Sequence, residues 1–157
     1  MNNLLKVKVN ESLNLYGKVW PLEAAKANVM IITGMEEHTS RYDHFAAFLN
    51  QQGFSVHALD YFGQGENVLS KEQVLGAVPF DGFRLYTDTL GAYIKKIKGD
   101  LPLFVIGHSM GSFLAQELAQ KYSSTIDKLV VIGSNGPDPL LKIGFLLAKL
   151  TVRKYNY

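Results

Sequence analysis

The sequence predicts an α/β protein with a mostly parallel sheet, leading antiparallel strands and helices on both faces. From residue 28 to residue 132, short apolar runs of strand length alternate with segments of helical length. Before them, apolar and polar residues alternate through residues 7–19, which is typical of a hairpin with one face in water. Because strands that alternate with helices form βαβ units, we expect the sheet to become parallel after this hairpin.

Composition bounds the class of protein. The 157 residues are 47% hydrophobic and 19% charged, which is ordinary for one globular domain with a single core. The 16 basic and 14 acidic residues give a net charge of +2 without a basic block, so nucleic acid is not a predicted partner. Because the chain has no cysteine, disulfides, thiolate metal sites and a cysteine nucleophile are excluded. No metal or cofactor is predicted.

The sequence also bears on location. The first twelve residues, MNNLLKVKVNES, have neither the apolar core nor the cleavage site of a signal peptide, so we expect a cytoplasmic protein. No run of about 18 apolar residues occurs, so no transmembrane helix is predicted.

The first half of the chain predicts a buried strand, a polar loop and a helix. Residues 28–33, NVMIIT, form a continuous apolar run that suits a strand buried on both faces. The polar loop GMEEHTSR follows at 34–41 and leads into the helix. Ser40 and Asp43 have the spacing of a capping box, and Gly53 predicts the end of the helix.

The second half continues the alternation. A strand is predicted at 56–59, the loop DYFGQGEN follows at 60–67, and a helix spans residues 82–98. The last predicted strand is KLVVI at 128–132. Residues 140–152 are then apolar on nearly every side, so they must be buried or must move over an apolar site.

The stretch at 103–122, LFVIGHSMGSFLAQELAQKY, organises the rest of the chain. An apolar strand runs into GHSMG, and apolar residues at helical spacing follow. Ser109 therefore lies at a strand-to-helix turn between Gly107 and Gly111, which leave room where side chains would collide. We predict that the backbone of Ser109 is strained toward positive φ.

A serine at such a turn has the surroundings that a nucleophile needs. A serine hydroxyl becomes a useful nucleophile only if it is exposed at a strand end, can be reached by a histidine base and lies next to amides that can hold an oxyanion. The alternative is a glycine-rich turn with an incidental serine. The strand before the motif and the helix after it favour the nucleophile.

Three blocks of sequence then identify a resemblance. They are TGMEEHTSRYDHFA at 33–46, LDYFGQGEN at 59–67 and GHSMGS at 107–112. With them the chain resembles the α/β-hydrolase superfamily, in its branch of monoacylglycerol lipases, lysophospholipases and serine aminopeptidases of the S33 type. The resemblance runs from about residue 13 to the end, and the blocks together are specific to this branch.

The resemblance implies roles for four residues. The first block is similar to the HGxxEHxxRY oxyanion loop of the family, which makes the amides of Met35 and Met110 the two oxyanion donors. Donors of this kind are worth about 2.7 to 4 kcal/mol each in the transition state. Glu37 and Arg41 match positions that help to hold the polar head of the substrate in monoacylglycerol lipases. The alternative for this pair is a buried ion pair that only shapes the loop.

The chain departs from the pattern at three positions. Thr33 stands where the family usually has histidine, Gln64 replaces the histidine of the GHGxS loop, and Asn67 takes its serine position. We interpret these changes as drift that leaves the oxyanion amides in place. The alternative is an oxyanion loop that has decayed.

No triad base or acid is evident. In this fold the acid and the histidine follow the serine in the chain, but no histidine follows Ser109. Asp127 precedes a strand and Asp138 opens the segment that resembles a lid, so neither is expected to be the triad acid. None of the chain's histidines has the expected topology, and His108 is expected to point away from the reactive side; the four are His38, His44, His57 and His108.

The chain therefore resembles the N-terminal portion of a longer hydrolase. We expect one partial domain over 1–157, with the core sheet and helices at 1–137 and the start of a lid at 138–157. We expect the C-terminal part of the α/β-hydrolase fold to be missing.

Three hypotheses of function follow. The first is a serine hydrolase that cleaves lipid monoesters, such as a monoacylglycerol or a lysophospholipid, with the lid allowing transient contact with a membrane surface. Peptidase and thioesterase chemistry use the same turn, so the reaction is better defined than the substrate. The second hypothesis is a noncatalytic fragment without the triad acid and base. The third is a partner-binding surface on the apolar segment at 140–150.

Overall fold

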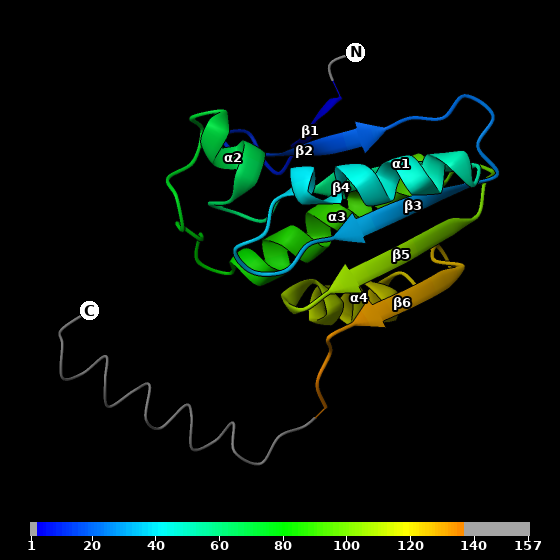
Figure 1. Ribbon diagram of the computed structural model, residues 1–157. Helices are drawn as coiled ribbons and strands as arrows, with labels where there is room; N and C mark the ends of the chain where they lie inside the picture. Colours follow the sequence, from blue (N-terminus) through cyan, green and yellow to red (C-terminus); the bar gives the residue numbers. More distant parts are fainter. Residues whose placement is uncertain (1–2, 137–157) are drawn as a thin grey trace, which may run out of the picture.

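The computed structural model describes residues 3–136, which form one six-stranded sheet with helices on both faces (Figure 1). The elements in chain order are β1 (Leu4–Lys8), β2 (Asn14–Trp20), β3 (Ala27–Ile32), the 3-10 turn η1 (Thr39–Tyr42), α1 (Asp43–Gln51), β4 (Phe54–Leu59), α2 (Gly65–Leu69), α3 (Gly82–Lys98), β5 (Leu103–His108), α4 (Met110–Lys121) and β6 (Lys128–Ile132).

The strand order is β1-β2-β4-β3-β5-β6, and the sheet changes direction once. β1 is antiparallel to β2, and β2 is antiparallel to β4. From β4 onward, all neighbouring strands are parallel. The predicted hairpin followed by a parallel sheet is therefore confirmed. The parallel strands bring their carboxyl ends to one edge, where loops carry the site.

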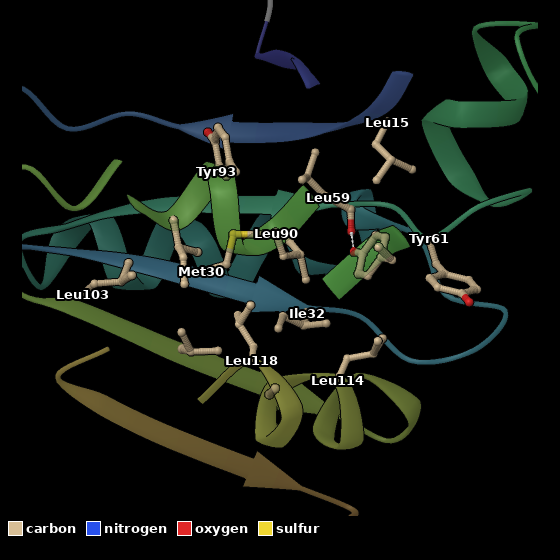
Figure 2. Packing of buried hydrophobic residues seen from close by; sticks show 14 of the residues in the cluster. Leu15, Met30, Ile32, Leu59, Tyr61, Leu90, Tyr93, Leu103, Leu114 and Leu118 are labelled. Carbon is tan, nitrogen blue, oxygen red and sulfur yellow. Dashed lines mark hydrogen bonds between the residues drawn. The ribbon is translucent and has the colours of Figure 1, made fainter. Parts of the chain in front are cut away.

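The helices form a layer on each face. Helix α1 covers one face through Ala46, which packs with Val29 and Ile31 of β3. Helices α3 and α4 cover the other face, where the larger core cluster lies between them and the sheet. Figure 2 shows this cluster, in which residues from the sheet pack against residues from both helices; they include Met30, Ile32, Leu90, Leu114 and Leu118. Burial of such side chains contributes about 1.5–3 kcal/mol each.

The predicted capping box is wrong. Ser40 lies inside η1, and α1 begins after Tyr42 with no hydrogen bond from a capping side chain. The Asp43 carboxylate instead receives the indole N–H of Trp20 at 3.1 Å and pairs with Lys18 at 3.1 Å. Asp43 is thus engaged in a tertiary ion pair and hydrogen bond and does not form the local cap.

Two other boundaries were tested by the structure. Gly53 follows the end of α1 with φ of 89°, as the predicted helix stop requires. The segment DYFGQGEN, predicted as a loop, contains the start of the short helix α2. Periodicity does not reveal this helix because it has only five residues.

Strand β6 forms the outer edge of the described sheet. All five of its residues are exposed, and β5 is its only strand partner within residues 3–136. The expected lid at 138–157 lies outside the described residues. Within residues 3–136, no helix has the length and apolar character needed to cross a bilayer.

Candidate active site

Ser109 lies where β5 ends and α4 begins. Its φ of 51° and ψ of −122° are unfavourable for a residue with a side chain, so the predicted strain is confirmed. The side chain is exposed at the carboxyl edge of the sheet. The backbone is held on both sides, because Ser109 N–H donates to Ile132 O at 2.9 Å and Ser109 O accepts the N–H of Ser112 at 2.9 Å.

The two glycines of the motif permit close packing around this turn. A Cβ at Gly107 would lie 2.7 Å from the Cβ of Ala115, so any side chain there would push α4 away from β5. A Cβ at Gly111 would lie 2.5 Å from the carbonyl oxygen of Thr33, at the end of β3. The glycines therefore set the position of Ser109 relative to two neighbouring strands.

Met35 and Met110 come together at one cavity. Met110 opens α4, where the first N–H groups of a helix have no partner within the helix. Met35 follows Gly34, and a Cβ at Gly34 would lie 3.1 Å from the Cβ of Ser109. Among residues 3–136, neither methionine amide donates to a protein acceptor. Two unpaired amides beside a serine suit an oxyanion.

The cavity beside these amides has a volume of about 540 Å³. Its lining includes Tyr61 and Phe62 from the loop after β4 and Leu75 and Val78 from the following loop. A second cavity of about 330 Å³ lies on the α1 side of the sheet, with Arg41 and hydrophobic residues in its lining; they include Phe45, Ile106 and Ile132.

Glu37 is buried between the two cavities and holds several groups at once. Its Oε2 accepts the N–H of Gly34 at 2.6 Å and the O–H of Tyr42 at 2.9 Å, and it lies 3.0 Å from Nδ1 of His108. Its Oε1 pairs with Arg41 at 3.0 Å. Burial acts to raise the pKa of Glu37, but the hydrogen bonds from His108, Gly34 and Tyr42 outweigh it and lower the pKa below its usual value.

Asp60 is a site residue that sequence analysis missed. It is fully buried at the end of β4, and its carboxylate accepts the N–H of Thr39 at 2.7 Å and the N–H of Glu66 at 2.8 Å. It thereby ties the loop after β3 to the loop after β4. Burial raises the pKa of Asp60, and these hydrogen bonds oppose the rise. The sequence signal was an acid at a strand end followed by glycines.

The side chains at the three positions that depart from the family pattern differ in their hydrogen bonding. Asn67 accepts the N–H of Tyr16 at 2.7 Å and donates to the carbonyl oxygens of Asp60 and Tyr61, so it supports the loop. Thr33 Oγ1 and Gln64 Oε1 are buried without a hydrogen-bond partner among residues 3–136.

Ser109 has no histidine base among residues 3–136. Within the described part of the chain, no hydrogen bond joins Ser109 Oγ to an imidazole. His57 is buried on β4 against Tyr93, and His108 is bound to Glu37. Asp127 accepts the N–H of Leu103 at 2.8 Å and pairs with Lys98, so it is engaged away from the serine. No cluster of His, Asp and Glu able to hold a metal occurs within residues 3–136.

Comparisons with curated proteins give distant relatives. A monoglyceride lipase homolog of Monkeypox virus is 28% identical over 141 residues, which are 87% of this chain and 49% of that protein. Phospholipase YtpA of Bacillus subtilis is 31% identical over 99 residues, 62% of this chain and 36% of that protein. The monoglyceride lipase of Rattus norvegicus is 25% identical over 143 residues, 87% of this chain and 45% of that protein. The chain spans half or less of the length of these relatives.

Solved structures and a family model agree with the fold. A lipase in its open form is 26% identical with a TM-score of 0.72, covering 82% of this chain and 43% of that one. A thermostable carboxyl esterase from Bacillus coagulans, at 22% identity, shares the fold with a TM-score of 0.73 over 98% of this chain and 52% of that one. The predicted α/β-hydrolase fold is confirmed. Because the model for "Serine aminopeptidase, S33" matches residues 23–154, the chain belongs to this family of α/β-hydrolases.

Proposed function

We propose that this chain carries the nucleophile of a serine hydrolase that cleaves carboxylic esters through an acyl-enzyme. The strained conformation of Ser109, at φ of 51°, supports the proposal most, because a turn held in this conformation exposes the hydroxyl beside two free amides. Ser109 Oγ attacks the carbonyl carbon, and the amides of Met35 and Met110 receive the negative oxygen. The alcohol then leaves, and water releases the acid from the serine.

The base for this reaction is not found among the residues described. All four histidines of the chain lie within residues 3–136, and no imidazole among them is hydrogen-bonded to Ser109 Oγ. Attack by a serine hydroxyl needs a base within about 2.6 to 3.2 Å, oriented by a third group. Turnover therefore requires a base that none of these four histidines provides in the conformation described.

We propose a lipid monoester as the substrate. The cavity of about 540 Å³ beside Met35 and Met110 has aromatic and aliphatic walls, which suit an acyl chain. Arg41 lines the second cavity and pairs with Glu37 through one nitrogen, but 66% of its side chain is exposed, so its other N–H groups can hydrogen-bond a polar head. The named relatives are monoglyceride lipases and a phospholipase, which supports this class. Transient membrane contact through residues 138–157 stays a prediction.

One observation favours a second candidate, a fragment without catalytic turnover. The absence of an imidazole at Ser109 within residues 3–136 leaves the hydroxyl without an activating base. Peptidase and thioesterase activity use the same nucleophile and oxyanion amides, so they differ from the main proposal only in substrate.

Labelling with a fluorophosphonate tests the nucleophile. We expect slow modification of the 157-residue chain at Ser109, with a rate that rises with pH because hydroxide must replace the missing base. Multiple turnover of a short aryl ester should stay far below enzymatic rates. Ser109→Ala should abolish labelling, whereas Ser123→Ala, at an exposed serine, should not. No labelling of Ser109 after long incubation, or rapid multiple turnover, would contradict this account.

Competition tests the substrate class. A long-chain monoacylglycerol should slow the labelling of Ser109 at concentrations where short esters and a triacylglycerol do not. Arg41→Met should weaken protection by the monoacylglycerol without changing protection by the free fatty acid. Equal protection by all four compounds would argue against a monoester site.

A further inference from the structure

We propose that Glu37 is a positioning residue, which fixes the oxyanion loop against the nucleophile turn. It does so by binding Gly34, which precedes the oxyanion donor Met35, and His108, which precedes the nucleophile Ser109. The inference rests on the proposed function, because it assigns a role within the same site. Gly34 directly precedes Met35, and His108 directly precedes Ser109. One carboxylate oxygen of Glu37 binds both, at 2.6 Å from Gly34 N and 3.0 Å from His108 Nδ1.

The contacts cross a long separation in sequence. Glu37 and His108 are 71 residues apart, and the β3–β5 ladder ends at Ile32 and Gly107, before it reaches either of them. Gly34 is pressed against the turn, because an added Cβ would lie 3.1 Å from Ser109 Cβ and 3.0 Å from Glu37 Oε2. Loosening the carboxylate would therefore shift the amide of Met35 relative to the serine hydroxyl, and oxyanion donors lose their effect when they move.

A carboxylate is the group that fits these contacts. It accepts hydrogen bonds and donates none, so it can serve the Gly34 amide, the Tyr42 hydroxyl and His108 on Oε2 while Arg41 pairs with Oε1. A glutamine side chain has the same shape but presents an N–H₂ group to one of these sets of donors. Glu37→Gln therefore removes the charge and breaks one of the two sets of contacts with little change in volume.

The carboxylate also fixes the proton on His108. Because Glu37 Oε2 can only accept, Nδ1 of His108 must carry the proton. A neutral His108 is then the Nδ1–H tautomer, with Nε2 as its unprotonated nitrogen.

Glu37 and Arg41 differ in burial, and this difference gives them different roles. Glu37 is 7% exposed and its Oε2 is already shared by three groups, whereas the side chain of Arg41 is 66% exposed. Arg41 is thus available to a substrate, and Glu37 acts through Gly34 and His108. This arrangement joins the two alternatives for the pair: Glu37 shapes the loop and holds Arg41 in place.

The rate of fluorophosphonate labelling tests the effect on the serine. Glu37→Gln should lower the maximal labelling rate about 100-fold, the size expected for losing one oxyanion donor, and should leave the half-saturating concentration nearly unchanged. Glu23→Gln is the matched control, because Glu23 is exposed and lines neither cavity, and it should label at the wild-type rate. Labelling of folded Glu37→Gln at the wild-type rate would overturn the proposal.

Nitrogen NMR of the wild-type chain tests the contacts without any variant. We expect His108 as the Nδ1–H tautomer and a downfield amide proton for Gly34, and both signals should change in Glu37→Gln. An Nε2–H tautomer of neutral His108 in the wild type would overturn the proposal. If Ser109 does not label at all, the proposed function fails, but these signals still decide whether Glu37 joins the two loops.

Discussion

Thr33 carries a buried hydroxyl directly after β3, and its Oγ1 has no hydrogen-bond partner among residues 3–136. A buried hydroxyl without a partner opposes folding, and valine has nearly the same shape. Thr33→Val should therefore raise the free energy of unfolding by about 1 kcal/mol, as measured by urea denaturation.

Thr87→Val provides the matched control for this substitution. Thr87 is also fully buried, but its Oγ1 donates to the carbonyl oxygen of Phe83 at 2.9 Å. Its replacement should lower the stability instead, because a satisfied hydrogen bond is lost. A loss of similar size at both positions would show that Thr33 has a partner after all.

At the scale of elements, the joint between α4 and β3 depends on Gly111. Alanine normally stabilises a helix relative to glycine by about 1 kcal/mol. At Gly111, however, a Cβ would lie 2.5 Å from the carbonyl oxygen of Thr33. Gly111→Ala should therefore destabilise the chain by about 1–3 kcal/mol through overpacking. It should also slow the labelling of Ser109, because α4 begins at Met110, directly after this serine.

Gly136→Ala is the control for this change, since a Cβ there would meet nothing within 4 Å. It should alter neither the urea midpoint nor the labelling rate. A stable, fully reactive Gly111→Ala variant would mean that α4 can shift without moving the serine.

The elements that the sequence predicted share one property: their signal is local. The strand before GHSMG and the helix after it are each specified by apolar residues within a few positions of each other, and the structure has both, as β5 and α4. The predicted cap at Ser40 is wrong because Asp43 binds Lys18 and Trp20, which are distant in sequence. Periodicity carries no information on such partners.

The site divides in the same way. Ser109 and its glycines were predictable because a short motif defines the turn. The links from Asp60 to Thr39 and from Glu37 to His108 join residues 21 and 71 positions apart, so only the packed sheet brings them together. A buried acid with several donors gives no pattern in a single sequence.

For the whole molecule, acid should weaken folding through His57. This residue is buried against Tyr93, and burial lowers its pKa from 6.5 to about 4. An unfolded chain therefore binds a proton at His57 at pH values where the folded chain does not. The contribution to stability is complete above about pH 6.5 and falls as the pH drops toward 4, with a loss of about 2 kcal/mol at about pH 5.

Urea unfolding between about pH 7.5 and pH 5 measures this loss. His57→Phe should flatten the pH dependence in this window even if it changes the stability at neutral pH. His44→Gln, at an exposed helical position, should keep the wild-type dependence. An unchanged pH dependence in His57→Phe would assign the effect to other groups.

Strand β6 has a consequence for the nucleophile that reaches beyond its place at the sheet edge. The amide of Ser109 donates to Ile132 O, so the turn is tied to the last residue of an exposed strand. Within residues 3–136, this strand pairs with β5 and with no other strand. Exposed edge strands open locally at a lower free energy than core strands. Each such opening releases the Ser109 amide, so hydrogen exchange at this amide reports how often β6 detaches. Pairing of the edge strand is thus one of the contacts that hold Ser109 in its strained conformation.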